Sequence, residues 1–258
     1  MSPPPKGYDS ATSVPALRRA VQILDLVTEH GASLSSADIA RRLRIPKSTC
    51  HGLINAMVEL GLLNRTSGGS VRIGPKSFRW GYAFFADVSP VEEFQEVCQH
   101  DASLKDVTVT LSVLEGRDVV YVGCKNSDAP LGLTFRIGMR LPAVYTATGK
   151  AMLSTVPDED LDEMFKDRWP QPLTPHGVGS LDGLRAELSE VRERGYSIDD
   201  GQIRDGMLCI GAPIRDHTGR STAGVAASIL LGEATAEEVD RLGEKMLGIA
   251  AVLAARLG

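Results

Sequence analysis

The stretch Leu34–Leu63, LSSADIARRLRIPKSTCHGLINAMVELGLL, contains two short amphipathic helices separated by a tight turn. Ser35 stands three residues before Asp38, a spacing typical of a capping box at a helix start. Pro46 has no backbone N–H to satisfy and suits the first turn of the second helix, while Gly61 suits its end. Two such helices predict a helix-turn-helix, a motif whose second helix can enter the major groove of DNA.

The second helix has an apolar face and a polar face. Its apolar stripe is expected to consist of Cys50, Leu53, Ile54, Met57 and Leu60. Its polar face and first turn carry Lys47, Ser48, Thr49, His51 and Asn55. Short polar groups can contact base edges, and a lysine near a helix start can bind phosphate. A helical hairpin with a solvated face would look the same, so the helix pair alone does not decide between DNA reading and packing.

The residues that follow favour DNA binding. Residues 62–65 and 70–73 are two alternating runs around a glycine-containing turn, which predicts a β-hairpin. A helix-turn-helix followed by a hairpin is a winged helix, with Arg65 and Arg72 placed to reach the DNA backbone or minor groove. A third helix ahead of the motif is expected to close the core with Leu17, Ala20, Val21, Leu24 and Val27.

Composition limits the class of protein. The chain has 258 residues, 43% of them hydrophobic, and no apolar run approaches the ~20 residues of a membrane span. Residues 1–12 lack the apolar segment of a signal peptide and are expected to form a disordered lead-in. Four cysteines lie far apart with no CxxC pair, which favours reduced thiols in a cytoplasmic protein over disulfides or a zinc site.

Charge is unevenly distributed along the chain. Residues 14–81 contain ten Lys/Arg and four Asp/Glu, a net charge of +6, whereas the other residues carry −11 of the total of −5. A basic N-terminal segment followed by an acidic remainder indicates a nucleic-acid-binding module attached to a domain of another kind.

The remaining residues predict an α+β domain. Residues 13–74 are assigned to the winged helix-turn-helix domain, 75–89 to an apolar linker helix and 90–258 to a second domain. Helical spacing is found at 90–103, 148–154, 181–194 and 239–253. β-rich runs are found at 107–114, 119–124, 131–135, 196–199, 207–215 and 222–230. Strands in hairpins with helices grouped between them predict an antiparallel sheet flanked by helices.

Several chemical motifs can be tested on the residues alone. Thr148-Gly149-Lys150 is not a phosphate loop, because that loop needs a glycine at the position of Val144 and Ser or Thr at that of Ala151. What survives is a helix start able to offer the backbone N–H groups of Thr148 and Gly149 to an anion.

A second group of polar residues, around the run 199–209, needs its own interpretation. Asp199, Asp200, Asp205 and Cys209 would need a histidine to make a convincing metal site, and His217 is distant. A Cys209 nucleophile would need a nearby base. A polar lining to a ligand pocket requires neither, and it is the preferred interpretation.

Four stretches resemble the IclR-type transcriptional regulators over nearly the whole chain: IPKSTCHGLINAMVELGLL, VRIGPKSFRWG, GMRLPAVYTATGKAML and RGYSIDDGQIRDGMLCIGAPIRD. The resemblance implies a GAF-like effector domain that holds a small organic molecule, and dimers through the DNA-binding half, commonly paired into tetramers. By position, the family's ligand contacts fall on Leu141, Ala147, Thr148, Asp199, Cys209, Ala226 and Ser228. Gly52 stands where many members have arginine.

Together these observations predict a ligand-responsive regulator that binds an operator in double-stranded DNA. Its effector is expected to be a small organic acid, with an aromatic acid as one candidate, and Asp199 is expected either to face a hydroxyl or amine or to hold its loop. No catalytic residue, metal, cofactor or membrane contact is expected. Two alternatives stay open: a small-molecule hydrolase using Cys209 with a DNA-targeting module, and an architectural DNA binder.

Overall fold

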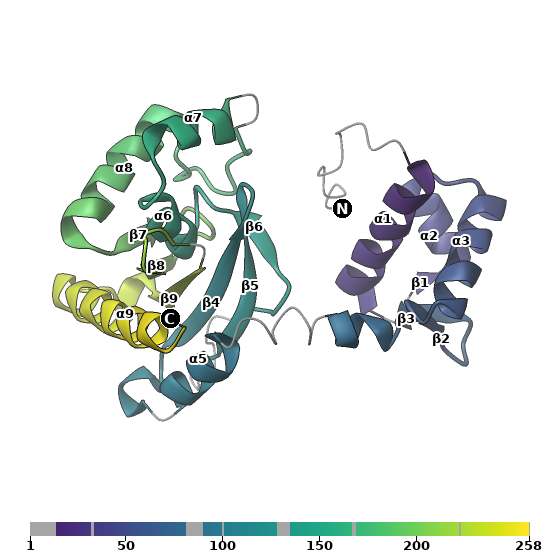
Figure 1. Cartoon of the computed structure of the whole chain (residues 1–258), viewed down its shortest axis with the longest axis horizontal. Coiled ribbons are helices and arrows are strands. Elements are labelled where there is room, and N and C mark those ends of the chain that lie inside the picture. Colours follow the sequence, from purple (N-terminus) through teal and green to yellow (C-terminus); the bar gives the residue numbers. More distant parts are fainter. Residues whose placement is uncertain are drawn as a thin grey trace. The chain divides into compact units, whose positions relative to one another are not determined.

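The computed structural model describes residues 14–31, 34–80, 90–99, 101–127, 135–166, 169–221 and 223–257. They belong to two compact units, residues 1–87 (unit 1) and 88–258 (unit 2), which Figure 1 draws. The expected lead-in, residues 1–12, lies outside the described residues. So do residues 81–89 of the expected linker helix, whose first part is helical at 76–80.

Unit 1 is a winged helix-turn-helix. Its helices are α1 (Pro15–His30), α2 (Ser36–Leu43) and α3 (Lys47–Glu59). Its strands β1 (Leu34–Ser35), β2 (Leu63–Arg65) and β3 (Ser70–Ile73) form an antiparallel sheet in the order β1-β3-β2. The recognition helix of the motif is α3, and the wing is the hairpin β2–β3 (Figure 1).

Local sequence signals set the ends of α2 and α3. The Ser35 hydroxyl accepts from the Asp38 N–H at 3.2 Å, and Asp38 Oδ2 accepts from the Ser35 N–H at 3.2 Å, so the capping box is complete. Arg44 adopts a left-handed conformation with φ of 54°, which ends α2 and turns the chain. After buried Ile45, Pro46 occupies the N-cap of α3.

The core of unit 1 follows the predicted stripes with three corrections, one of which is that Val21 is half-buried and lies outside this core. Its buried side chains are Ile23, Val27, Leu34, Ile39, Ala40, Ile45, Cys50, Ile54, Met57, Leu63 and Val71. Leu17 was expected in this core but is 59% exposed, because it lies in the first turns of α1, ahead of Ile23 and Val27, the two residues that α1 buries. Leu60 is 57% exposed because it caps α3 where the chain reverses at Gly61, whose φ is 75°.

Unit 2 is built on a six-stranded antiparallel sheet. Its order is β6-β5-β4-β9-β8-β7. The strands are β4 (Thr108–Glu115), β5 (Asp118–Lys125), β6 (Arg140–Pro142), β7 (Ser197–Asp200), β8 (Met207–Ile214) and β9 (Ala223–Leu230). Two short 3₁₀ turns, η2 (Ala102–Leu104) and η3 (Leu231–Glu233), lie in the connections.

Within the described residues of unit 2, α-helices lie on both sides of this sheet. Helices α5 (Pro90–Gln99) and α9 (Ala236–Leu257) contact β4, β5, β8 and β9. Helices α6 (Ala147–Leu153), α7 (Asp158–Phe165) and α8 (Leu181–Arg194) lie on the other side (Figure 1). No described helix is both long enough and apolar enough to cross a membrane.

The described sheet has an edge strand that the sequence analysis did not predict. A strand was predicted at Leu131–Phe135, but residues 131–134 lie outside the described residues and Phe135 is not in a strand. The edge strand next to β5 is β6, where Leu141 pairs with Val119. Three residues that end in proline give no alternating pattern, so this strand could not be read from periodicity.

Helix α6 lies directly on the backbone of the sheet, and all seven of its residues are buried. The Ser197 hydroxyl on β7 donates to the Ala147 carbonyl at 2.5 Å. A Cβ atom on Gly211 of β8 would lie 2.6 Å from the Ala147 backbone, and one on Gly149 would lie 2.1 Å from the Ala143 carbonyl oxygen. Only glycine permits these two approaches, so Gly211 sets the distance between α6 and the sheet, and Gly149 lets α6 pack against the segment that leads into it.

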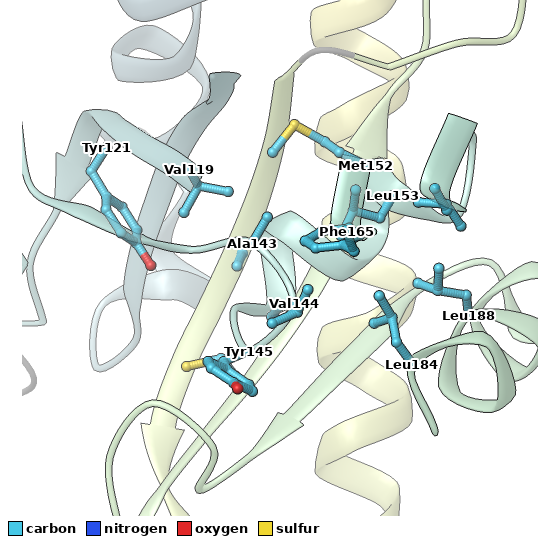
Figure 2. Packing of buried hydrophobic residues seen from close by; sticks show 14 of the residues in the cluster. Val119, Tyr121, Ala143, Val144, Tyr145, Met152, Leu153, Phe165, Leu184 and Leu188 are labelled. Atoms are coloured by element: carbon cyan, nitrogen blue, oxygen red, sulfur yellow. The ribbon is translucent and has the colours of Figure 1, made fainter. Parts of the chain in front are cut away.

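The helices on this side share a hydrophobic cluster with the sheet. Figure 2 shows its side chains arriving from β5, from the segment before α6, and from α6, α7 and α8. The labelled residues are Val119, Tyr121, Ala143, Val144, Tyr145, Met152, Leu153, Phe165, Leu184 and Leu188. Ala147, Cys209 and Ala226 belong to the same cluster, so three predicted effector contacts lie in the core of unit 2.

Gly211→Ala is expected to lower the free energy of unfolding of unit 2 by about 1–3 kcal/mol, because the new methyl group would collide with the backbone of α6. Gly248→Ala on α9, where an added Cβ meets nothing within 4 Å, is the matched control and should stabilise by up to about 1 kcal/mol. The chain has two tryptophans, so in a Trp80→Phe background the fluorescence of Trp169 reports urea unfolding of unit 2. Equal midpoints for Gly211→Ala and the background would contradict this account of α6.

Candidate functional site

The outward face of α3 is polar and open to solvent. Lys47, Ser48 and His51 are exposed, Thr49 and Asn55 are half-buried, and the opposite side of the helix buries Cys50, Ile54 and Met57. Ser48, His51 and Asn55 follow one another at intervals of three and four residues, so they share one face. Gly52 lies on this face and has open space around the position of a Cβ. Nothing in unit 1 therefore requires glycine there.

The two wing arginines point in different directions. In the β2–β3 pairing Arg65 lies opposite buried Val71, whereas Arg72 lies opposite Asn64. Side chains alternate between the faces of a strand, so Arg65 shares the face of buried Leu63, which is turned toward the core. Arg65 reaches the recognition helix and donates from Nη2 to Asn55 Oδ1 at 2.6 Å. Of the two wing arginines, Arg65 is thus the one that contacts the recognition helix.

Unit 2 carries a buried row of polar side chains across four strands. Asp199 pairs with Cys209, Cys209 with Ser228, and Ser228 with Thr108. All four are at most 5% exposed. Cys209 Sγ lies 3.0 Å from Ser228 Oγ. Three of the predicted effector contacts are thus adjacent on one face of the sheet, which is the face that carries α6.

A second row lies two residues further along the strands, on the same face. It consists of Ser197, Gly211, Ala226 and Thr110. Ala147 packs over Gly211, so the structure also brings Ala147 and Ala226 next to the first row. Five of the seven predicted contacts are therefore neighbours.

The other two predicted contacts lie at the edge of this group, since Thr148 follows Ala147 on α6 and Leu141 packs against the cluster that contains Cys209 and Ala226. The Thr148 hydroxyl accepts from Ser112 at 2.7 Å, and Thr148 contacts Gly224. Gly224 is four residues from Ser228 along β9, or about 13 Å at the rise of a strand. Leu141 lies on β6, with β5, β4 and β9 between it and β8.

The expected anion seat at the start of α6 is wrong for Gly149. Its N–H donates to the hydroxyl of Thr146, the N-cap residue, at 3.0 Å. An N-cap side chain commonly satisfies a free N–H in the first turn of a helix, and Thr146 precedes the residues that the sequence singled out.

Aromatic side chains that the sequence did not single out stand near the polar rows. The rings of Tyr121 and Phe135 lie 5.1 Å apart, centroid to centroid, and both residues share the cluster of Cys209 and Ala226. Burial, with lesser contributions from Cys209 and Asp199, raises the pKa of the Tyr121 phenol. Tyr121 is therefore a neutral hydrogen-bonding group beside an apolar ring.

Asp199 holds the loop that follows β7. Its Oδ1 accepts from the Gln202 N–H at 2.7 Å and from the Ile203 N–H at 3.3 Å. Of the two roles expected for this residue, the structure thus contains the loop-holding one. Burial raises the pKa of the carboxyl to about 6, an effect that Lys150 and the two N–H groups only partly offset.

An ion pair between a buried lysine and a half-buried glutamate adjoins Asp199, and the sequence analysis did not predict it. Lys150 is 1% exposed, and its Nζ lies 2.7 Å from Glu187 Oε2 on α8. Glu187 Oε1 accepts from Gln202 Nε2 at 3.0 Å. Within the described residues Gln202 Oε1 is buried with no hydrogen-bond partner. In the sequence, Lys150 is noticeable because it follows Gly149 as the lysine of a phosphate loop does, but this pattern gives no indication of its partner Glu187.

The chemistry around Cys209 does not favour catalysis. Burial, followed by the influence of Asp199, raises the pKa of its thiol, so the nucleophilic thiolate is suppressed. Its hydrogen-bonding neighbour Ser228 is a hydroxyl and not a general base. Among the described residues, no group of three or more His, Cys, Asp or Glu side chains is arranged to hold a metal ion.

A surface cleft of about 680 Å³ lies elsewhere on unit 2. Its lining includes Glu159, Asp162, Glu163, Phe165 and Trp169, between α7 and the start of α8. No predicted effector contact lines it. Its acidic residues would repel an organic acid, so the buried polar rows remain the candidate effector site.

The raised pKa of Asp199 makes a testable contribution to stability. In the folded protein the Asp199 carboxyl keeps its proton up to about pH 6, whereas in the unfolded chain it loses the proton near pH 3.8. The free energy of unfolding therefore falls as the pH rises from about 4 to 6. Asp199→Asn keeps an oxygen for the two N–H donors but cannot ionise. Its unfolding free energy relative to wild type should therefore rise between pH 4 and 7, by up to about 3 kcal/mol.

The measurement is urea unfolding followed by Trp169 fluorescence at several pH values, in the Trp80→Phe background. Asp106→Asn, a change at an exposed residue before β4 that does not influence Asp199, is the control and should track wild type. A difference between Asp199→Asn and wild type that stays constant with pH would contradict the assignment.

Comparison with known proteins places both units in one family. The family described as "Bacterial transcriptional regulator IclR C-terminal" matches residues 91–254. The IclR helix-turn-helix domain matches residues 16–67. The two matches cover unit 2 and the recognition motif of unit 1.

Individual relatives agree with this result. The chain is 26% identical to the HTH-type transcriptional regulator XynR of Escherichia coli K12, over 95% of this chain and 98% of that one. It is 50% identical to the repressor BlcR of Agobacterium tumefaciens, covering 96% of this chain and 99% of that chain with a TM-score of 0.63. An IclR homologue of Microbacterium hydrocarbonoxydans, solved with 4-hydroxybenzoate, is 25% identical over 93% and 99% of the two chains, with a TM-score of 0.73.

The matched families and these relatives are transcriptional regulators and not enzymes. The polar face of α3, the wing and the buried rows of unit 2 thus belong to a chain of the IclR family of bacterial transcriptional regulators.

Proposed function

We propose that this regulator binds a pseudo-palindromic operator as a homodimer or a dimer of dimers, and that a small organic acid bound in unit 2 changes its affinity for that operator. It acts in the cytoplasm as a repressor. The observation that carries the proposal is the open polar face of α3, with Ser48, His51 and Asn55 at helical spacing beside a wing that bears Arg65 and Arg72.

Electrostatics supports the DNA-binding role. The positive charge of the chain is concentrated in residues 14–81, where it attracts phosphate, while the rest of the chain is acidic. Lys47, in the first turn of α3, is placed for a phosphate, and the short side chains of Ser48 and His51 for base edges. Gly52, with no side chain on this face, lets the helix approach the floor of the groove closely.

Exposed apolar side chains support a dimer. Leu17, Phe78 and Trp80 of unit 1 are 59%, 78% and 54% exposed. Large apolar side chains that remain in solvent are typical of surfaces covered by a second chain. Each chain has one recognition helix, so a symmetric pair reads two half-sites of opposite orientation.

The buried rows of unit 2 support an organic acid effector. Ser228 and Cys209 offer donors, and Tyr121 with Phe135 offers aromatic rings for the rest of the molecule. The homologue solved with 4-hydroxybenzoate makes an aromatic acid the first candidate, and the repressor BlcR supports repression as the mode of action. The effector acts by binding one arrangement of the paired DNA-binding units more tightly than another.

The DNA-binding role predicts different losses for two residues of α3. His51→Ala should weaken binding to a duplex selected from a random library by about 1–3 kcal/mol, and it should have little effect on binding to unrelated DNA. Lys47→Ala should weaken both duplexes similarly and reduce the slope of log affinity against log salt by about 1. Fluorescence anisotropy at several salt concentrations measures both.

The control for this experiment is Lys105→Ala, an exposed lysine of unit 2 that should leave both affinities unchanged. A loss for His51→Ala that is equal on the selected and the unrelated duplex would remove His51 from base reading. Sedimentation of the complex gives the stoichiometry, and one chain per duplex would exclude the dimer.

The effector role predicts that Ser228→Val weakens binding of the preferred acid at least tenfold, because two methyl groups replace the hydroxyl beside Cys209. Calorimetry across a panel of aliphatic and aromatic acids, beginning with 4-hydroxybenzoate, identifies that acid on the wild-type protein.

Ala227→Val adds two methyl groups at the next residue of β9, on the opposite face of the sheet, and is the matched control. It should keep the wild-type affinity for the acid. If a folded Ser228→Val protein also binds like wild type, the effector site lies elsewhere.

A further inference from the structure

We propose that Arg65 sets which base Asn55 recognises. By holding the side-chain oxygen of Asn55, it leaves only the amide NH₂ group to face DNA, so Asn55 reads a hydrogen-bond acceptor such as guanine N7 or O6. The inference rests on the proposed function, because it assumes that α3 enters the major groove.

The contact between the two residues follows from the fold of the wing. Leu63 is fully buried beneath α3, and Arg65 lies two residues later on the same face of β2. The guanidinium therefore extends over the helix, where Nη2 lies 2.6 Å from Asn55 Oδ1. Arg65 itself is exposed, so its other N–H groups remain open to solvent and to phosphate.

Chemistry fixes the orientation of the Asn55 amide. A guanidinium has five N–H donors and no acceptor, so the amide atom that faces it must be the oxygen and not the nitrogen. The NH₂ group then points away from Arg65. Among the described residues, no protein acceptor lies within hydrogen-bond distance of this NH₂ group, and it remains available to an outside acceptor.

This orientation changes the base code. A free asparagine recognises adenine by two bonds, since its oxygen accepts from N6 and its NH₂ donates to N7. The oxygen keeps a second lone pair, but a strong bond to a charged donor holds the oxygen toward Arg65, so the amide does not turn to present both its oxygen and its NH₂ group to adenine and the two-bond contact is lost. A single donor fits guanine N7 or O6 and tolerates adenine only through N7.

Arg65 thus acts as a positioning residue as well as a phosphate contact. An arginine that served only phosphate would, when removed, weaken all sequences alike. Removal of Arg65 should instead free the Asn55 oxygen and change the preference at one position of each half-site.

The experiment is selection from a random duplex library with the full-length protein and four variants. Asn55→Ala should abolish the base preference at one half-site position, which identifies the position read. At that position wild type should favour guanine or accept both purines, and Arg65→Ala should shift the ratio of adenine to guanine about tenfold toward adenine. Arg72→Ala, from the other face of the wing, should leave the ratio unchanged.

Asn55→Asp provides an independent test. A carboxylate keeps the bond to Arg65 but has no NH₂ group, so guanine preference at this position should be lost while the fold is retained, as circular dichroism can verify. A wild-type preference for adenine that Arg65→Ala leaves unchanged would overturn the inference. So would an unchanged preference in Asn55→Ala. Failure of wild type to enrich any duplex would instead contradict the proposed DNA-binding function itself.

Discussion

The contact of α6 with the backbone of β8 determines the arrangement of unit 2. At Gly211 the absence of a side chain lets the Ala147 carbonyl come close enough to accept from Ser197 at 2.5 Å. Every residue of α6 is buried as a result, and a lysine in this helix must find its counter-ion inside the domain. Glu187 of α8 supplies it, so a close backbone contact leads to an ion pair that joins a buried lysine of α6 to α8.

Unit 1 was largely predictable because its signals are local. The capping box at Ser35, the turn before α3 and the glycine after it all act within a few residues, and a hairpin is set by its turn. The errors occurred where packing decides. Leu17 and Leu60 fit the helical period, but each lies near the end of its helix, where period alone does not say whether the core extends that far.

Unit 2 was predictable in its strands and less so in its site. The resemblance to a known family identified Asp199, Cys209 and Ser228 as ligand contacts. These residues are adjacent because of the register between β7, β8 and β9, and local sequence patterns do not reveal that register. Thr146 can be identified as the N-cap only when the first residue of α6 is known, and the sequence alone does not give that residue. For this reason the N–H of Gly149 was expected to be free. The ion pair of Lys150 spans 37 residues and has no local signal.

The charge balance of the buried rows constrains how an acid could bind there. Lys150 is committed to Glu187, so it does not offer a free cation to a carboxylate. A second anion beside ionised Asp199 would be repelled strongly at low dielectric. The carboxylate of an acid bound in these rows would therefore lie away from Asp199, whose Oδ1 already accepts from two backbone N–H groups.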